Sequence, residues 1–491
     1  MDLSSVQNFQ DKKVTVMGLG RFPQGSGLGA AKWLLLHGAK LIVTDLKPET
    51  DLSESVETLR RVFRAAQAAG QNVHEPVFVL GAHRPEDFVF ADLIMRNPGV
   101  PVESPLLESA RQKGIPIETD VSLFVQLYPH PVIGVTGTRG KSTTTALIGD
   151  MLKRQDAETV VAGNIQHSPL EDLDHLLTLG RPVPVVLELS SWLVESMDHL
   201  SHAPEISVFT NLSPDHLNRY PSMEAYGQAK SGIFTRQTEK QIAIMNVNLG
   251  WLSPRVKSRK YFFAIDQVEP GAFVKKGIVT IADQGQNQQV CSVSEIRLPG
   301  QHNIENALAA VLAAHFAGVS LDHIVESLRT FGGLPYRQQI IVTKDGVTYI
   351  NDTCATSPDG TVAALQTFAQ PAPRFAFWRK KKIILISGGA SKELPFASMG
   401  QAIRRACKHV VLLEGNATDA IAQAIGSAMP QTRVNSMSAA ISAAESLAQP
   451  GDIILLSPGT ASFGLFKNEF DRGEQFNQAV ANLDELSTSD G

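Results

Sequence analysis

Short runs of apolar, largely β-branched residues alternate along this chain with longer stretches that suit helices. The first run, Lys13–Gly20 (KVTVMGLG), is followed by a helix-compatible stretch around Ala30–His37 and by a second run that ends at Asp45. Strand-like runs separated by helical stretches are typical of parallel sheets with crossover helices. The pattern therefore predicts an α/β protein.

Three blocks of this kind follow one another along the sequence. The second opens with PVIGVTG at Pro131–Gly137, and the third contains GVTYIND, KIILISGG, HVVLLEG and DIILLSPG. Residues 128–131 (YPHP) and 332–335 (GGLP) have the composition of linkers. A chain of 491 residues also exceeds the size of one hydrophobic core. We therefore expect three domains, at residues 1–128, 129–333 and 334–491.

Composition and charge argue against several classes of function. The chain has 44 Lys and Arg against 49 Asp and Glu, a net charge of -5, which does not favour non-specific nucleic-acid binding. Its three cysteines are widely spaced and favour a reducing compartment over a disulfide framework or zinc site. The first residues lack a signal-peptide pattern, and no apolar run approaches the roughly 20 residues of a membrane helix. We expect a cytoplasmic protein without a nucleic-acid or membrane partner.

The strongest local signal is the segment Val135–Thr143 (VTGTRGKST). An apolar strand leads into a glycine-containing turn, and a helix-compatible run follows. Glycine lets the backbone wrap closely around phosphate, and amides at a helix N-terminus point toward the anion. Lys141 can then reach the outer phosphates, and the Ser142 hydroxyl can contact Mg²⁺. The spacing departs from the full Walker A pattern at Val135, but phosphate binding is favoured over an ordinary strand–turn–helix junction.

Two later strand-like runs of the same block also end in polar residues. Glu188 closes the first, in VVLELSS, and Asp215 and His216 follow the second, in TNLSPDH. Ligands of open α/β sheets bind outside the carboxyl ends of the strands, so we expect these residues to share a crevice with the phosphate loop. Mg²⁺ prefers oxygen ligands, which suits Glu188 better than His216. Alone, each residue could be a cap or a solvated surface group; their common location indicates function.

These motifs belong to a longer series that resembles the Mur ligases. The series keeps the family's order over nearly the whole chain: TGTRGKSTT, ELSSW, NLSPDHLNRYPSMEAYGQAK, LPGQHNIENALAA, GLPYR, NDTCATSPDGTVAAL, SGGASK and LLSPGTASFGLFKNEFDRG. It looks most like the ligases that join glutamate to UDP-N-acetylmuramoyl-L-alanine. The resemblance implies an N-terminal Rossmann-like domain that binds UDP, a central P-loop-type ATPase domain with a mostly parallel sheet, and a C-terminal Rossmann-like domain that binds the amino acid.

The resemblance also implies the reaction, an ADP-forming amide ligation in peptidoglycan precursor synthesis. A free carboxylate is a poor electrophile, so ATP first converts the substrate carboxylate to an acyl phosphate, which the amino group of glutamate attacks. Mg²⁺, as one ion or two, and protein cations would hold the developing charge. We expect UDP-N-acetylmuramoyl-L-alanine and glutamate as substrates, with the D isomer favoured, and a monomeric enzyme.

Individual residues take their roles from the same resemblance. The matches to ATP contacts are Gly137, Thr138, Arg139, Gly140, Lys141, Ser142, Thr143, His302, Asn303, Asn306, Arg337 and Asp352. The matches to metal ligands are Ser142, Glu188 and His216, and the catalytic set is Lys141, Glu188, His216 and Lys230. The matches to substrate contacts are Asp45, Asn97, Gly99, Asn164, Thr356, Lys392, Ser462 and Phe463.

Lys230 matches a lysine that similar enzymes carry as a carbamate, an anionic oxygen ligand beside the metal. From spacing alone, Lys230 could equally be a solvated helix lysine, and the segment around His302 could be a helix N-cap.

Departures from the family pattern leave further interpretations open. Cys354 stands where many glutamate-adding enzymes have a lysine, which keeps L-glutamate open as the substrate. Gly18-Leu19-Gly20 followed by Asp45 imitates a dinucleotide fingerprint, but residues 21–25 break the G-x-G-x-x-G spacing. A nicotinamide-dependent oxidoreductase would also leave TGTRGKSTT unexplained. A folylpolyglutamate synthase-like ligase and a non-catalytic, nucleotide-regulated module are two further hypotheses.

Overall fold

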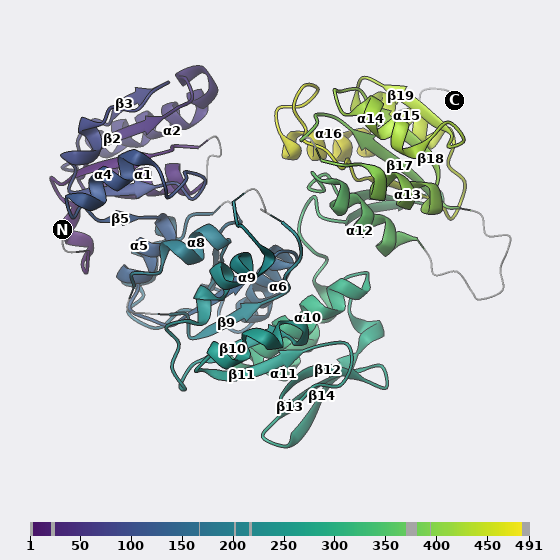
Figure 1. The fold of residues 1–491 in the computed structure, drawn as a ribbon, viewed down its shortest axis with the longest axis horizontal. Coiled ribbons are helices and arrows are strands. Elements are labelled where there is room, and N and C mark those ends of the chain that lie inside the picture. The colour runs from purple at the N-terminus through teal and green to yellow at the C-terminus, as the bar shows by residue number, and fades with distance from the viewer. Residues whose placement is uncertain are drawn as a thin grey trace. The chain divides into compact units, whose positions relative to one another are not determined.

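The structure is a computed structural model that describes residues 3–20, 25–165, 167–200, 203–215, 219–369, 381–392 and 394–483. The chain divides into two compact units, one of Met1–Arg297 and His302–Phe331 and the other of Leu298–Gln301 and Gly332–Gly491. Three mostly parallel sheets with helices packed on them make up these units (Figure 1). The predicted α/β class is therefore confirmed.

The first sheet is parallel throughout and has the strand order β3-β2-β1-β4-β5. Its strands are β1 (Lys13–Met17), β2 (Lys40–Asp45), β3 (Val77–Leu80), β4 (Leu93–Arg96) and β5 (Ile117–Glu118). The helices of this part are α1 (Ser26–Leu36), α2 (Glu49–Ala68), α3 (Glu86–Val89), α4 (Pro105–Gln112) and α5 (Asp120–Leu127). Helices on both faces bury the central strands, which explains their continuous apolar sequence.

The central sheet has the order β14-β13-β12-β11-β10-β9-β6-β8-β7. Its parallel strands are β6 (Val132–Thr136), β7 (Val160–Gly163), β8 (Val185–Glu188), β9 (Ile206–Phe209), β10 (Ile242–Asn246), β11 (Arg259–Phe263) and β12 (Gly271–Lys275). The helices are α6 (Lys141–Lys153), α7 (Leu170–Thr178), α8 (Ser191–Ser196), α9 (Met223–Ser231), α10 (Gln301–Phe316) and α11 (Leu321–Thr330).

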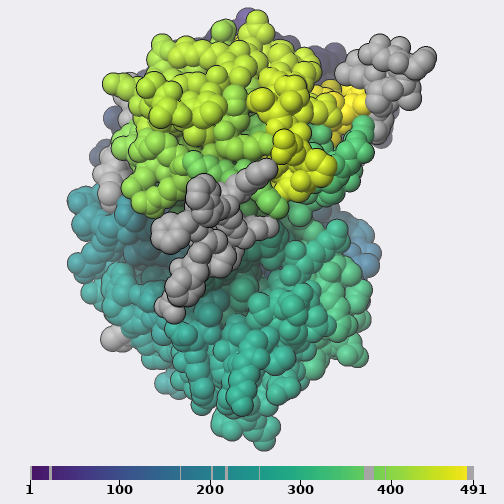
Figure 2. Space-filling model, turned by 90° about the vertical axis from the view of Figure 1, so that its right-hand side faces the viewer, coloured from purple at the N-terminus to yellow at the C-terminus, as the bar shows by residue number. Residues whose placement is uncertain are grey.

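An antiparallel extension completes this sheet, and the sequence patterns did not predict it. Strands β13 (Ile278–Asp283) and β14 (Gln286–Ser292) follow β12 through two-residue turns. Both residues of each turn have positive φ, 50° and 78° in the first and 48° and 78° in the second, as in the tight hairpin turns that match strand twist. The resulting hairpin projects from the sheet and forms the lowest surface in Figure 2.

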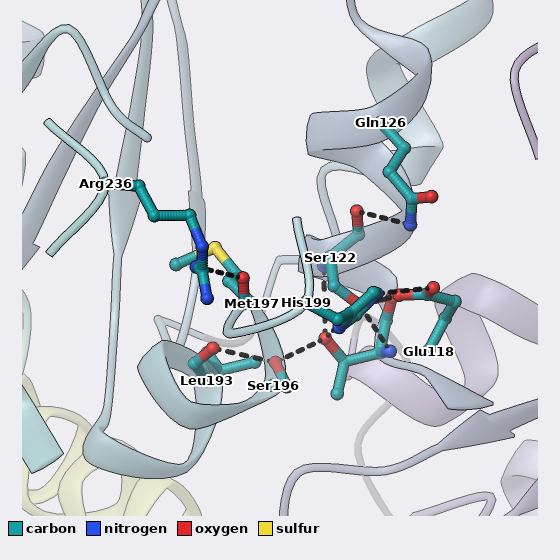
Figure 3. A network of polar contacts seen from close by, with 9 residues as sticks. Glu118, Ser122, Gln126, Leu193, Ser196, Met197, His199 and Arg236 are labelled. Atoms are coloured by element: carbon teal, nitrogen blue, oxygen red, sulfur yellow. Dashed lines mark hydrogen bonds and ion pairs between the residues drawn. The ribbon is translucent and has the colours of Figure 1, made fainter. Parts of the chain in front are cut away.

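Polar contacts join the first and central sheets within their unit. Lys32 of α1 pairs with Glu171 of α7. At the end of the first sheet, Glu118 lies 2.8 Å from His199 Nε2, and the hydroxyls of Thr119 and Ser196 are 3.1 Å apart (Figure 3). The contact between Thr119 and Ser196 joins α8, the helix that follows β8, to the end of the first sheet.

The second unit contains a sheet of order β15-β16-β20-β17-β18-β19, parallel except for β15. Its strands are β15 (Gln339–Lys344), β16 (Val347–Asn351), β17 (Ile383–Gly388), β18 (Cys407–Leu413), β19 (Gln431–Val434) and β20 (Ile453–Leu456). Its helices are α12 (Pro358–Phe368), α13 (Ala397–Ala406), α14 (Thr418–Ile425), α15 (Met437–Glu445) and α16 (Glu469–Ala481).

Alternate residues of β17 enter the two apolar cores of this unit, Ile384 and Ile386 one core and Ile383 and Leu385 the other. Strands β16, β17, β18 and β20 coincide with the four apolar runs that the sequence pattern picked out. Within the described ranges, no helix has the length and apolar character needed to cross a bilayer.

Candidate active site

The phosphate-loop segment follows β6, which lies between β8 and β9 in the central sheet. Val135 is paired with Glu188 of β8, and Thr136 with Phe209 of β9. All three strands run in the same direction, so their carboxyl ends meet at one edge. The loop, the Glu188 carboxylate and the turn after β9 therefore converge there, while His216 itself lies outside the described residues.

Backbone conformation and space both require glycine at two positions of the loop. Gly137 has φ 148°, and a Cβ added there would overlap Thr210 Oγ1. Gly140, the N-cap of α6, has φ 78°, and a Cβ there would overlap Asn306 Oδ1. No side chain of Gly140 can cap the helix, so the first amides of α6 remain suited to an anion.

Hydrogen bonds from the neighbouring strand hold the loop in place. The amide of Thr138 donates to the Asn211 carbonyl at 2.9 Å, and the amide of Arg139 donates to the Asn211 side-chain oxygen at 2.9 Å. Lys141 Nζ donates to the loop carbonyls of Gly137 at 2.9 Å and Thr138 at 3.0 Å. The ammonium thus lies within the turn whose backbone would surround a phosphate.

The two asparagines expected near adenine lie against this loop. Asn306 is buried on α10, and its Oδ1 accepts a 3.4 Å hydrogen bond from Thr144 of α6. Its Nδ2 donates to Asn303 Oδ1 at 3.1 Å. His302 is exposed in the first turn of the same helix. Ser142 and Thr143 are half-buried in the first turn of α6.

Glu188 has the environment of a metal ligand. It is 1% exposed, and Oε1 accepts a 2.7 Å hydrogen bond from Asn164 Nδ2. Oε2 is buried and has no hydrogen-bond partner among the described residues. Burying a carboxylate oxygen without a hydrogen-bond donor costs free energy. Mg²⁺ prefers oxygen ligands and would satisfy this oxygen. Asn164, expected as a substrate contact, here orients the carboxylate.

Lys230 is not a solvated helix lysine. Its side chain is 2% exposed on α9, with Nζ 4.7 Å from the centre of the Tyr226 ring. In the described part of the chain it makes no hydrogen bond or ion pair. Burial, reinforced by the positive charge of Lys141, lowers the pKa of Lys230 to about 7. A substantial fraction of this amine is therefore neutral near physiological pH, the state that reacts with CO₂.

The residues expected to bind UDP meet at the carboxyl edge of the first sheet. Asp45 accepts amide hydrogen bonds from Leu19 and Lys47, both at 3.0 Å. Asn97 follows β4, and its Oδ1 accepts the amide of Gly99 at 3.0 Å. Asp45 therefore organises the turns around it. The lengthened part of the first loop, residues 21–24, lies outside the described residues.

Asp352 is a buried carboxyl at the end of β16 in the second unit. Ser457 Oγ donates to its Oδ2 at 2.8 Å, and the Gln338 amide donates to Oδ1 at 3.1 Å. Burial outweighs both bonds and the charge of Arg337, and raises the pKa of Asp352 to about 7. Arg337 itself is exposed in the segment before β15.

The expected amino-acid contacts also belong to the second unit. Lys392 Nζ donates to Thr356 Oγ1 at 3.0 Å. Ser462 is buried, whereas Phe463 is 55% exposed. Burial raises the pKa of the Cys354 thiol to about 11, so this residue is neutral and cannot replace the missing cation.

Arg472 is a residue of this region that the sequence motifs did not single out, although it lies in the FKNEFDRG block. Its guanidinium is fully buried in α16 and donates to the hydroxyl and carbonyl of Thr353, each at 2.9 Å. It also approaches the Thr460 carbonyl at 3.4 Å. Arg472 therefore ties together the two loops that precede Thr356 and Ser462.

Comparison with known protein families gives three matches along the chain. The Mur ligase MurD-like N-terminal domain matches residues 12–119, the Mur ligase middle domain matches 135–314, and the Mur ligase glutamate ligase domain matches 336–459. A UDP-N-acetylmuramoylalanine–D-glutamate ligase of Roseiflexus sp. (strain RS-1) is 39% identical over 485 residues, which cover 96% of this chain and 98% of the relative.

Solved structures share the fold at lower identity. The UDP-N-acetylmuramate-alanine ligase MurC of Thermotoga maritima is 18% identical with a TM-score of 0.57, covering 96% of this chain and 99% of its own. The MurF ligase of Thermotoga maritima in complex with ADP is 17% identical with a TM-score of 0.53, covering 90% and 95%. The family indicated by the sequence motifs is confirmed, and this chain belongs to the Mur ligase family of amino-acid ligases.

Proposed function

We propose that this protein joins D-glutamate to UDP-N-acetylmuramoyl-L-alanine, the two substrates that its relatives' names give, and that it uses ATP to do so. The observation that carries the proposal is the convergence of the phosphate loop and the buried Glu188 at one edge of the central sheet, with the buried Lys230 close enough to interact with the charges of Lys141 and Glu188. A phosphate anion, a divalent cation and an anionic lysine derivative would complement the charges of these groups.

The loop after β6 would hold the nucleotide phosphates. Lys141 would exchange the carbonyls of Gly137 and Thr138 for phosphate oxygens and support the charge on the transferring group. Asn303 and Asn306 would bind the adenine side, and Arg337 and Asp352, which match ATP contacts of similar enzymes, would also contact ATP. An oxygen of the alanine carboxylate then attacks the γ-phosphorus, the bond to ADP breaks, and an acyl phosphate forms.

The amino group of glutamate attacks the acyl carbon in the second step. The tetrahedral intermediate loses a proton from its nitrogen and collapses to the amide with departure of inorganic phosphate, which takes that proton and one of the original carboxylate oxygens. Exclusion of water protects the acyl phosphate from hydrolysis.

Ser142, Glu188 and His216 would hold Mg²⁺, whose charge stabilises the phosphates when the ion is bound. The unpartnered Oε2 of Glu188 supports this assignment. Lys230 would add CO₂ through its neutral amine, release a proton, and become a carbamate anion beside the metal. Its burial and its pKa of about 7 support that modification.

Substrate binding would be divided among the domains proposed at residues 1–128, 129–333 and 334–491. The turns around Asp45, Asn97 and Gly99 would bind the UDP group, and Asn164 would reach the muramoyl peptide. The glutamate contacts would be Thr356, Lys392, Ser462 and Phe463. We place the reaction in the cytoplasm and expect a monomer. We favour the D isomer because the family's contacts Lys392 and Thr356 are retained, although Cys354 stands in place of a lysine.

The test is phosphate release by the purified protein with ATP and Mg²⁺, omitting one component at a time. We expect release to require both UDP-N-acetylmuramoyl-L-alanine and an amino acid, and D-glutamate to be the best of a panel. Release that needs neither substrate, or that follows a pteroate or folate substrate instead, would contradict the proposal.

A further inference from the structure

A histidine that the sequence motifs did not single out follows β3 at the carboxyl edge of the first sheet. Strand β3 is the neighbour of β2, with Leu80 paired to Asp45 (Figure 1). The Gly81 amide donates to the carbonyls of Asp45 at 2.9 Å and Lys47 at 3.0 Å. The turn after β3 therefore lies against the turn after β2, and His83 is close enough to Asp45 for the carboxylate charge to act on it.

Two contacts fix the imidazole ring of His83. Its Nδ1 lies 2.7 Å from Oγ1 of Thr44, which belongs to β2. The ring also meets the buried ring of Phe88 edge to face, with 5.9 Å between the ring centres. His83 is half-buried and makes no other hydrogen bond or ion pair within the described ranges. The ring is therefore held in place while its Nε2 edge remains available to a ligand.

The hydrogen bonds of Thr44 determine which nitrogen of the ring carries the proton. The Thr44 hydroxyl also lies 3.3 Å from the Ala82 carbonyl, which can only accept. A hydroxyl has one proton, so both contacts can be hydrogen bonds only if Thr44 donates to Ala82 and His83 Nδ1–H donates to Thr44. Burial lowers the pKa of His83 below its ordinary value of 6.5, against the opposing charge of Asp45, so the ring is neutral at pH 8. Nε2 is then a hydrogen-bond acceptor.

The charge of Asp45 indicates which part of a UDP group would lie beside His83. A diphosphate would be repelled by the Asp45 carboxylate. The turn at Asn97–Gly99, also proposed to bind UDP, and the adjoining turn at Gly18–Gly20 contain no carboxylate. These two turns lie side by side, because a Cβ on Gly18 would come within 2.9 Å of the Asn97 side chain. The diphosphate would therefore lie at those turns, and the uncharged uracil at the corner of Asp45 and His83.

We propose that His83 determines specificity for the base of the substrate by accepting the N3–H of uracil at Nε2. The inference rests on the proposed function, which has the UDP group bind at this edge of the sheet. Uracil carries a hydrogen on N3, whereas cytosine has a lone pair there that would face the lone pair of Nε2. A site built to form a hydrogen bond rejects a ligand that lacks the donor, because the acceptor in the site is left unpaired.

The experiment measures the binding of UDP and of CDP to the whole protein at pH 8 by isothermal titration calorimetry. The variants are His83→Leu, which removes the acceptor, and Thr44→Val, which removes the hydroxyl that fixes the tautomer. The control is His74→Leu, which alters a half-buried histidine that precedes β3 and contacts Asp11 instead. Thermal unfolding is recorded for each protein.

We expect the wild-type protein to bind UDP about 10-fold or more tightly than CDP. His83→Leu should lose about 10-fold in UDP affinity and keep its CDP affinity, so that it binds the two nucleotides alike. Thr44→Val should lose a smaller part of the preference, because the ring can then adopt either tautomer. His74→Leu should retain the wild-type ratio.

A wild-type ratio in His83→Leu would overturn the inference and leave the proposed function intact. An equal loss of UDP and CDP affinity would also overturn it, since it indicates a structural role only, as would a loss of preference in His74→Leu. If His83→Leu does not fold, Thr44→Val decides, and an unchanged ratio there overturns the inference. Wild-type protein that binds neither nucleotide would contradict the UDP site of the proposed function, and the inference with it.

Discussion

The buried carboxyl of Asp352 should make the second unit less stable as the pH rises. Its pKa is 3.8 in a solvated chain and about 7 in the folded protein, because burial disfavours the charged form. Below 3.8 both states are protonated and the residue has no effect. Between 3.8 and about 7 the unfolded chain releases the proton while the folded protein retains it, so stability is lost throughout this window. Above about 7 the loss is complete.

The size of the loss follows from the two pKa values. A difference between 3.8 and about 7, at ~1.4 kcal/mol for each pH unit, corresponds to about 4 kcal/mol at pH 8. At pH 5 the loss is only about 2 kcal/mol by the same reasoning. Asp352→Asn removes the charge and keeps both hydrogen bonds, because the amide oxygen can accept from Gln338 and the amide nitrogen can donate to Ser457. We expect this variant to be more stable than wild type, and more so at pH 8 than at pH 5.

The assay is urea unfolding of the whole protein, followed by hydrogen-exchange mass spectrometry of peptides from β16 and β17. The control is Asp359→Asn, which alters an exposed carboxylate on α12. Activity should fall in Asp352→Asn while stability rises, since the carboxylate is proposed to approach ATP. A stabilisation that is equal at pH 5 and pH 8, or a destabilisation at pH 8, would refute the reasoning from burial.

Four other outcomes follow from the site. Gly137→Ala should abolish ATP binding in an equilibrium titration, because the added methyl group would overlap Thr210; retained affinity would remove the loop assignment. Lys141→Ala should bind ATP but form no acyl phosphate in a rapid-quench experiment, and turnover near the wild-type rate would contradict its role. Lys230 should give a ¹³C NMR carbamate signal with labelled CO₂ that weakens from pH 8 to pH 6, and Lys230→Ala should be partly rescued by acetate; full unrescued activity would exclude the carbamate. Finally, D-glutamate should be used in preference to L-glutamate in separate turnover assays, and the opposite preference would show that Cys354 marks a differently built pocket.

The phosphate loop and its surroundings could be predicted from the sequence because local chemistry determines them. The segment Gly140-Lys141-Ser142 follows an apolar strand. Neighbouring residues set the conformation of its glycine and the start of the helix, so the local sequence is enough to predict both. The convergence of Glu188 with that loop followed from a general rule about parallel sheets. The alternation of strand-like runs with helical stretches predicted the α/β class, because that pattern is a general property of parallel sheets with crossover helices.

Contacts between distant side chains could not be predicted in this way. Glu195 and Arg219 are 24 residues apart, and only the packing of α8 beside the continuation of β9 brings them together. The hairpin of β13 and β14 was missed because β14 is largely polar, and its turns, at residues 276–277 and 284–285, carry glycine at only one of two positions. The pKa of Lys230 is lowered by burial. The sequence did not reveal this burial, since by spacing alone Lys230 could equally have been a solvated helix lysine.

The most direct test of the proposed ligation is isotope transfer from substrate to phosphate. UDP-N-acetylmuramoyl-L-alanine labelled with ¹⁸O in its alanine carboxylate is incubated with ATP, Mg²⁺, D-glutamate and the enzyme. If the carboxylate is activated as an acyl phosphate, each inorganic phosphate released should carry one ¹⁸O atom, seen by mass spectrometry, in a one-to-one ratio with the new amide. Unlabelled phosphate, released with or without amide formation, would contradict activation of the carboxylate by the nucleotide at the loop after β6.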